Sequence, residues 1–213
     1  MHDITPDSIE IRIATGLERL AQALRSHAWN DALPRGLTPT QGRILAFLAD
    51  RPGTRLAELA EEIGVRPATA SDAVRVLETK GLVAKSRHPE DRRALQLGLT
   101  PAGREVSTAT SRWPELLADA TVDLTDDEKV VLLGAVVRMI RQLQERGQIP
   151  IARMCPSCVF FRPRAHADPA RPHHCAFVDA PLGDVDLRVD CPDHEVAAAP
   201  DAAAIWRRYV GSY

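Results

Sequence analysis

The sequence lacks a long hydrophobic run and lacks any marked excess of one charge, and both absences exclude classes of protein. No apolar segment is long enough to span a bilayer, and the opening residues, MHDITPDSIEIRIATG, lack the charged-then-apolar layout of a secretion signal. The 27 Lys and Arg residues nearly balance the 29 Asp and Glu residues, so overall charge does not indicate nucleic acid. We therefore expect a cytoplasmic protein with no membrane partner.

Catalytic motifs are absent as well. The sequence contains no Ser-His-Asp order, no phosphate-binding loop and no zinc-hydrolase motif, so we expect that the protein is not an enzyme. Its 213 residues are enough for one full domain and a small second one. Between Arg51 and Arg104 ten Lys and Arg residues face seven Asp and Glu residues, which is a modest local excess of positive charge.

Two short helical patterns flank a tight turn at Gly64 in the same stretch. Apolar residues recur at three and four residues before the turn, and Pro67 suits the first position of a second helix. Such a pair can place its second helix in the major groove of DNA, although an ordinary helical hairpin would show the same spacing. The residues predicted to contact DNA from the second helix are Arg66, Ala68, Thr69, Ser71, Asp72 and Arg75.

A basic hairpin follows these helices and favours the DNA-binding interpretation. Its strands are predicted from Leu82 and Val83 and over residues 94–99, with a cation-rich loop over residues 85–93 between them. A basic loop beside a recognition helix can enter the neighbouring minor groove, where the potential is most negative. Asp91 is expected to orient Arg93 or Arg87 through charge-assisted hydrogen bonds. The predicted DNA contacts in the hairpin are Lys85, Arg87, Arg92 and Arg93.

The motifs of this region resemble those of the MarR (multiple antibiotic resistance regulator) family. Asp91-x-Arg93 followed by Leu99-Thr100 is similar to that family's wing signature, and LTPTQGRILAFL, LETKGLV and LTPAGRE stand in matching order around it. The resemblance covers residues 8–148, about two-thirds of the chain. It implies a mainly α fold with a small β wing, in which a winged helix-turn-helix is joined to a helical dimerisation region. It also implies a homodimer, double-stranded DNA as partner, and in many members a small organic effector.

The flanking sequence predicts four more helices. Asp7 or Ser8 can cap a first helix that runs to about Trp29, and Thr38 with Pro39 and Gln41 predicts the start of a second. A helix begins at Thr100-Pro101, passes Trp113 and breaks or kinks at Pro114. The last begins at a Thr125 cap and ends near Gly147. Its long apolar face, placed beside the first helix, suits dimerisation, although packing within its own domain is the simpler alternative.

The composition changes beyond residue 148, and we place a domain boundary there, with residues 1–148 and 149–213 on its two sides. The second segment is rich in Pro, His and Asp, has no helical period before a short helix at residues 201–213, and is too loop-rich to build a large core. It contains all four cysteines of the chain, namely Cys155, Cys158, Cys175 and Cys191. We therefore expect a small loop-rich module that a metal group or disulfides hold together.

Three chemistries compete for these cysteines. Disulfides are disfavoured in a protein that carries no export signal. Structural zinc takes four cysteines, yet the usual second C-x2-C pair is missing. An iron–sulfur cluster also takes four thiolates, and its size lets the ligands come from separate loops. The spacing C-x2-C-x16-C-x15-C is similar to that of high-potential iron–sulfur proteins and of small subunits of certain glycyl-radical enzymes, which implies a [4Fe-4S] cubane.

Apolar residues beside the cysteines are expected to shield the group, and the histidines of the segment to lie around it or at the surface. The shielding residues are Val159, Phe160, Phe161, Ala176, Phe177 and Leu187. The leading hypothesis is a DNA-binding transcriptional regulator, a repressor by preference, whose iron–sulfur cluster senses redox state, oxygen, nitric oxide or iron supply. One alternative is a regulator with structural zinc that responds to an organic ligand. An electron-transfer protein that uses the helix-turn-helix as scaffold is the alternative from another class.

Overall fold

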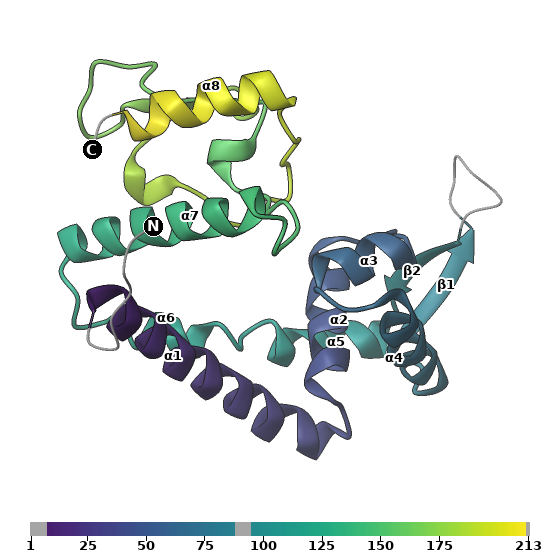
Figure 1. Cartoon of the computed structure of the whole chain (residues 1–213). Helices are drawn as coiled ribbons and strands as arrows, with labels where there is room; N and C mark the ends of the chain where they lie inside the picture. The colour runs from purple at the N-terminus through teal and green to yellow at the C-terminus, as the bar shows by residue number, and fades with distance from the viewer. Residues whose placement is uncertain (1–7, 88–94, 212–213) are drawn as a thin grey trace. The chain divides into compact units, whose positions relative to one another are not determined.

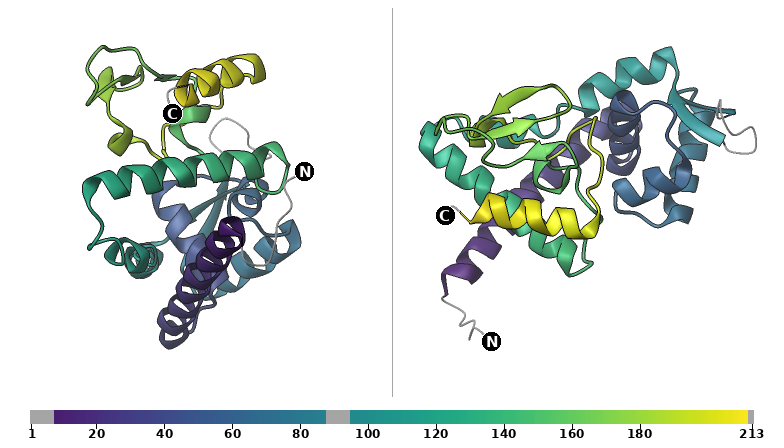
Figure 2. Two further views of the ribbon diagram at one scale, coloured as in Figure 1. Left: turned by 60° about the vertical axis from the view of Figure 1, so that its left-hand side comes forward. Right: turned by 90° about the horizontal axis from the view of Figure 1, so that it is seen from above.

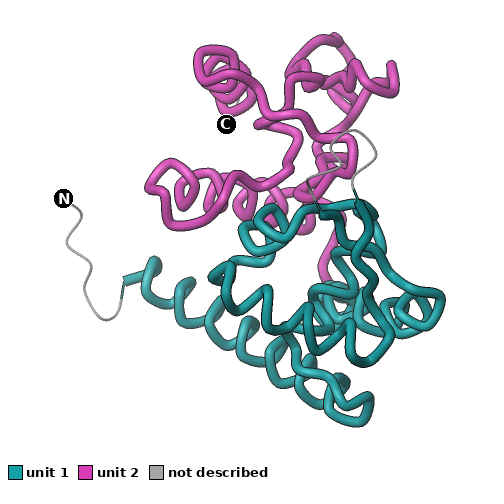
Figure 3. Tube along the Cα trace, turned by 90° about the vertical axis from the view of Figure 1, so that its right-hand side faces the viewer, with its two compact units in different colours: residues 1–123 teal, residues 124–213 magenta. Residues whose placement is uncertain are grey.

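The computed structural model describes residues 8–87 and 95–211. The chain divides into two compact units, residues 1–123 and residues 124–213, which Figure 3 shows in separate colours. This division differs from the predicted boundary at residue 148. The long helix before that boundary buries one side against the four-cysteine segment that follows it, so the two belong to one packing unit. The predicted fold class, mainly α with a small β wing, is confirmed for the described residues.

The first unit consists of helices with one hairpin, labelled in Figure 1. Its elements in chain order are α1 (Ile9–Ala32), a 3-10 turn (Leu33–Arg35), α2 (Pro39–Asp50), α3 (Leu56–Glu62), α4 (Pro67–Thr79), β1 (Val83–Arg87), β2 (Leu95–Leu99), α5 (Pro101–Thr110) and α6 (Glu115–Asp119).

Local sequence signals determine where the helices of this unit begin. Ser8 caps α1 by accepting a hydrogen bond from the Ile11 N–H at 3.4 Å. Thr38 and Gln41 form a reciprocal capping box at the start of α2, so two backbone N–H groups without helical partners are satisfied at once. Gly36 adopts the left-handed conformation that ends the preceding turn. The predicted starts of α1 and α2 are confirmed.

The core of the first unit lies between α2, the α3–α4 pair and the base of the hairpin. Ile44, Leu45 and Leu48 of α2 are completely or almost completely buried, as is Leu97 of β2. The hairpin is anchored on this core because Leu97 also pairs with the residues before α3. Its N–H donates to the Thr54 carbonyl at 2.9 Å, and its carbonyl accepts from the Gly53 N–H at 2.9 Å. The wing is thus tied to the helix-turn-helix by backbone hydrogen bonds.

Helix α5 differs from the prediction at its end. It begins at the Thr100 cap and Pro101, as expected, but it ends at Thr110 rather than passing Trp113. The chain turns there, which buries Trp113 in the core against α2. A Cβ atom at Gly42 of α2 would lie only 2.2 Å from Trp113 Cη2, so the indole occupies space that only glycine leaves free. Pro114 then precedes the short helix α6.

The second unit is built on α7 (Asp126–Glu145) and α8 (Ala199–Val210), with short elements between them. Those elements are a 3-10 turn (Cys155–Ser157), β3 (Phe161–Arg162), β4 (His173–Cys175), β5 (Ala180–Leu182) and a 3-10 turn (Asp184–Asp186). The strands form one antiparallel sheet in the order β3-β4-β5. Figures 1 and 2 show α7 and α8 on two sides of this loop-rich segment.

The core of the second unit joins both helices to the cysteine segment. The buried side chains of this core are Val137 of α7, Tyr209 of α8, and Met154 and Phe161 of the segment between the two helices. Half-buried residues around them include Leu133 and Ile140 of α7 and Ile205 and Trp206 of α8. The predicted helix over residues 201–213 is confirmed in type and packs on the cysteine segment. Within residues 8–87 and 95–211, no helix is long and apolar enough to cross a membrane.

Candidate nucleic-acid interface and cysteine site

The turn between α3 and α4 is formed as the sequence predicts. Gly64 has a φ of +67°, which side chains rarely tolerate, and it ends α3 in the left-handed conformation. Pro67 occupies the first position of α4, where its missing N–H leaves no helical hydrogen bond unmade. Ala70, Val74 and Leu77 are fully buried on one face of α4. The opposite face of α4 is therefore the one presented to solvent.

All six residues predicted to contact DNA from this helix region are exposed. They are Arg66, Ala68, Thr69, Ser71, Asp72 and Arg75. The residues at the N-terminal end are small, apart from Arg66, so the α4 backbone can approach a groove closely. The structure thus brings the predicted set together on one open face, and contact with DNA itself stays a prediction.

Two of the predicted cations are already paired with carboxylates of α4. Arg75 Nη2 lies 2.6 Å from Asp72 Oδ1, and Lys85 Nζ on the wing lies 2.8 Å from Glu78 Oε2. Ion pairs as exposed as Arg75–Asp72 contribute little to stability because water screens them. A guanidinium has five N–H donors, so Arg75 can bind Asp72 and still donate to a second acceptor.

The hairpin carries its described cations on a strand rather than in a loop. β1 extends to Arg87 because Lys85 pairs with Leu97 and Arg87 pairs with Leu95, so the predicted loop over residues 85–93 begins too early. Both cations are exposed. Asp91, Arg92 and Arg93 lie outside the described residues, so their predicted roles stay predictions.

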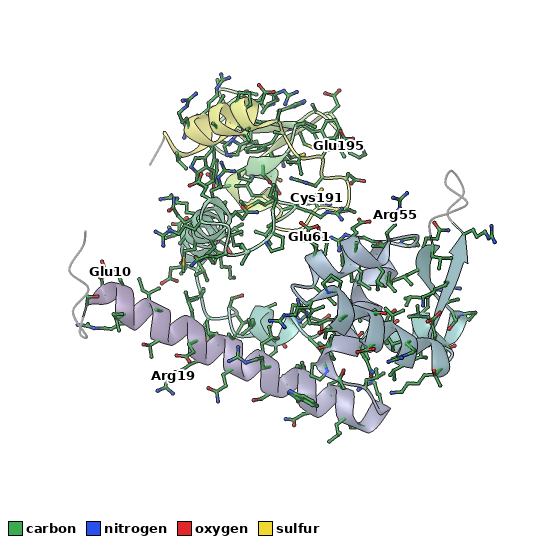
Figure 4. The ribbon with its side chains drawn as sticks, turned by 45° about the vertical axis from the view of Figure 1, so that its right-hand side comes forward. Glu10, Arg19, Arg55, Glu61, Cys191 and Glu195 are labelled. Carbon is green, nitrogen blue, oxygen red and sulfur yellow. The ribbon has the colours of Figure 1, made fainter. Side chains whose placement is uncertain are left out.

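The four cysteines gather around one cavity in the second unit. Cys155 belongs to a 3-10 turn, Cys158 follows it, Cys175 ends β4, and Cys191 stands in the loop before α8, where Figure 4 labels it. All four thiols are free and all four line a cavity of about 110 Å³. A water molecule needs roughly 10–15 Å³ of such space, so the cavity has room for a group of several atoms.

The two metal hypotheses require different spacings of the four thiols. One zinc ion binds each sulfur at about 2.3 Å, which brings neighbouring sulfurs to within roughly 3.8 Å of one another. Among the described residues, no three His, Cys, Asp or Glu side chains are grouped closely enough to share a single ion. The irons of a cluster stand apart from one another, so its cysteine ligands surround a larger space than the ligands of one zinc ion do. The donor set of four thiols fits either group chemically.

Burial and hydrogen bonding give Cys155 a particular environment. Burial raises the pKa of its thiol to about 11, the Arg188 N–H opposes this shift, and the other three thiols raise the pKa further. That N–H lies 3.3 Å from the Cys155 sulfur and donates to it. A thiol held protonated in this way needs a cation in the cavity to become a thiolate ligand.

The shielding residues are placed in part as predicted. Phe160, Phe161 and Phe177 line the cavity, and the Phe160 and Phe177 rings lie 5.3 Å apart. Leu187 is buried in the core of the unit and does not appear in the lining, nor do Val159 and Ala176. The lining also contains polar residues that the sequence does not single out for this place. They are Asp186, Arg188 and Asp193.

The histidines of the segment take different positions. His194 lines the cavity, and its Nε2 lies 2.9 Å from Ser157 Oγ. Burial lowers its pKa, which favours the neutral ring. His173 is buried, accepts from the Arg164 N–H at 3.2 Å and lies 3.2 Å from Asp184 Oδ1, so it holds the sheet to the following turn. His166 and His174 contact each other outside the core, as expected for surface groups.

Comparison with known proteins identifies the first unit. The model of the MarR family matches residues 35–94. The HTH-type transcriptional regulator YwaE of Bacillus subtilis, itself uncharacterized, is 31% identical over 137 residues, which are 62% of this chain and 79% of YwaE. Transcriptional regulator HosA of Escherichia coli O111:H- is 30% identical over 93 residues, which are 43% of this chain and 68% of HosA. The chain belongs to the MarR family.

Solved structures agree with this fold for the MarR-like part. Transcriptional regulator SlyA has a TM-score of 0.56 at 24% identity, covering 63% of this chain and 95% of that protein. CouR from Rhodococcus jostii, in a structure titled as bound to p-coumaroyl-CoA, has a TM-score of 0.53 at 20% identity, covering 68% and 97%. The MarR family model ends at residue 94, well before the first cysteine. The chain is a DNA-binding transcriptional regulator and not an enzyme.

Proposed function

We propose that this MarR-family regulator holds a [4Fe-4S] cluster in its four-cysteine cavity and that the state of the cluster controls DNA binding. The observation that carries the proposal is the convergence of Cys155, Cys158, Cys175 and Cys191 on one cavity with room for several atoms. The absence of a single-ion grouping among the described residues supports a cluster over zinc. The aromatic side chains in the lining limit access of water, and such burial tunes the potential of a cluster.

Helix α7 connects the cavity to the rest of the regulator. Its Val137 is completely buried against the cysteine segment, and Leu133 and Ile140 pack beside it. Its Leu132, Met139 and Leu143 are exposed, and their spacing places them on a neighbouring stripe of the same helix. One side of α7 therefore contacts the metal module, while another remains available for a second copy.

The proposed active form is a homodimer on a pseudo-palindromic operator. In each unit a helix carries exposed apolar residues that a second copy would cover: Ile9, Ile13 and Leu20 on α1, and Leu132, Met139 and Leu143 on α7. Two recognition helices about 34–36 Å apart would occupy successive major grooves. In this scheme cluster loss changes how the segment holds α7, which alters the spacing of the two α4 helices. Light scattering of the purified protein tests the dimer.

The decisive experiment is anaerobic purification with an optical spectrum and quantitation of iron, sulfide and zinc. We expect a brown protein with about four irons per chain. A colourless protein with one zinc per chain would instead support the alternative, in which the metal is structural and the regulator responds to an organic ligand. Mobility shifts then compare cluster-loaded and apo protein on the same DNA. Equal affinities would leave the cluster as a structural element without a sensing role.

A further inference from the structure

The four cysteines differ in how much regular secondary structure holds each of them in place. Cys155 lies in a 3-10 turn, Cys158 pairs with Val196 in a β-bridge, and Cys175 lies in β4 between two neighbouring strands. Cys191 is in the segment of residues 187–198, here named the Cys191 loop, which connects the last 3-10 turn to α8. No helix or strand residue precedes or follows Cys191 within that loop apart from the Val196 bridge. Its position therefore depends on contacts made by other segments.

Arg153 makes several of those contacts. Its Nε donates to the Cys191 carbonyl at 2.9 Å, and its Nη2 donates to the Pro192 carbonyl. Its own carbonyl accepts from the Cys191 N–H at 2.9 Å, and Asp190 Oδ1 lies 3.9 Å from Nε. The Arg153 side chain is only 16% exposed, so water competes weakly for these hydrogen bonds. One arginine thus holds the loop on both sides of Cys191.

Arg153 also brings a positive charge to the Cys191 loop. The Arg153 guanidinium donates to the Cys191 carbonyl, so a positive charge lies beside the backbone of the Cys191 loop. Four thiolates around a cluster carry net negative charge, which a cation in a low-dielectric setting stabilises. Loss of Arg153 would therefore remove two side-chain hydrogen bonds to the Cys191 loop together with the positive charge beside it.

We propose that Cys191 is the ligand that leaves first and that Arg153, as a positioning residue, sets how readily it leaves. The inference rests on the proposed cluster. In the step concerned, the bond between iron and Cys191 sulfur breaks, the thiolate takes a proton from solvent, and water or a chelator occupies the freed iron position. No electron is transferred. Because the Cys191 loop leads directly into α8, whose Tyr209 packs on the same core as Val137, release of this ligand acts on the core that contacts α7.

The test measures how fast an iron chelator bleaches the visible absorption of the anaerobically loaded full-length protein. Arg153→Gln removes the charge and one of the two side-chain donors, and we expect bleaching on the order of tenfold faster than in the wild type. Arg162→Gln is the matched control. Arg162 is an exposed arginine of β3 in the same segment whose Nη1 also donates to backbone carbonyls, those of Val159 and Phe161. Neither of these hydrogen bonds reaches the Cys191 loop. The bleaching rate of Arg162→Gln should therefore equal that of the wild type.

A second comparison keeps the inference testable if Arg153→Gln folds poorly. Cys191→Ser should retain more iron after loading than Cys158→Ser, because it leaves the three cysteines that lie in or next to the 3-10 turn and the sheet. Two results would overturn the proposal that Cys191 leaves first and that Arg153 controls its release. One is equal iron loss from the two serine variants. The other is an equal bleaching rate for Arg153→Gln and the wild type. Wild-type protein that binds no iron would instead overturn the proposed function, so the two failures are distinguishable.

Discussion

The indole N–H of Trp113 donates a hydrogen bond to Asp31 Oδ2 at 2.8 Å, across 82 residues of sequence. Asp31 stands in the last turn of α1 and also pairs with Arg35 at 2.6 Å through its other oxygen. The buried Trp113 ring rests on α2 at Gly42. This bond therefore links α1 to the core of the DNA-binding unit, and it makes the stability of that unit depend on pH.

Asp31→Asn should flatten that pH dependence. The Trp113 hydrogen bond and the Arg35 guanidinium lower the pKa of Asp31, against the effect of its burial. A carboxyl whose pKa is depressed by folding stabilises the fold above its unfolded pKa, about 3.9, and loses this contribution as pH falls through its lower folded pKa. Urea unfolding at pH 6 and at pH 3 should show a larger loss of stability for the wild type than for Asp31→Asn. Equal losses would mean that the bond to Trp113 does not favour the charged carboxyl.

Gly42→Ala should destabilise the same unit. The added Cβ would lie 2.2 Å from Trp113 Cη2 and 3.1 Å from Thr110 Cγ2, so the indole or the helix must shift. Overpacking of this kind costs about 1–3 kcal/mol in the free energy of unfolding. Gly16→Ala in α1 is the control, because nothing lies within 4 Å of its Cβ position. Alanine there should be neutral or stabilising by roughly 0.5–1 kcal/mol. Thermal unfolding of both variants compares them directly, and similar Tm values would contradict the packing at Gly42.

Local sequence signals were sufficient to predict most of the helices in the first unit. The features that the sequence did not reveal depend on contacts between residues far apart in the chain. The Thr38–Gln41 capping box and the left-handed Gly64 depend on residues within one turn, so their spacing is sufficient to predict them. The end of α5 at Thr110 depends on the packing of Trp113 against Gly42 and on its hydrogen bond to Asp31. Both of these residues lie far from Trp113 in sequence. Arg153 was missed for the same reason, since it bonds to a carbonyl 38 residues further on and belongs to no motif.

Arg75→Ala should weaken DNA binding. Arg75 is exposed on α4 and held by Asp72 at 2.6 Å, with the rest of its guanidinium open to a base edge or phosphate. Loss of a base contact costs about 1–3 kcal/mol, which is roughly a fivefold to 150-fold increase in Kd. Fluorescence anisotropy on DNA selected from a random library measures the change. Arg19→Ala, an exposed arginine of α1 labelled in Figure 4, is the control and should leave Kd unchanged.

The same assay distinguishes base recognition from charge at this helix. If Arg75 contacts a base, Arg75→Ala should lower affinity for selected DNA far more than for unselected DNA. If it contacts only phosphate, both affinities should fall together and the salt slope should drop by about one. Asp72→Ala should raise affinity for unselected DNA, because it removes a negative charge from the exposed face of α4 that is predicted to contact the duplex. A fall in that affinity would mean that the ion pair orients Arg75 for phosphate.

Val137→Ala tests whether α7 transmits the state of the cysteine site. Val137 is completely buried with Met154, Phe161 and Tyr209, so truncation leaves a void on the side of α7 that faces the four-cysteine segment. We expect the variant to load iron normally while the ratio of DNA affinities between loaded and apo protein falls towards one. Val131→Ala is the matched control, because this valine of the same helix is 72% exposed. An affinity ratio unchanged by Val137→Ala, with iron content equal to the wild type, would place the signal path elsewhere than α7.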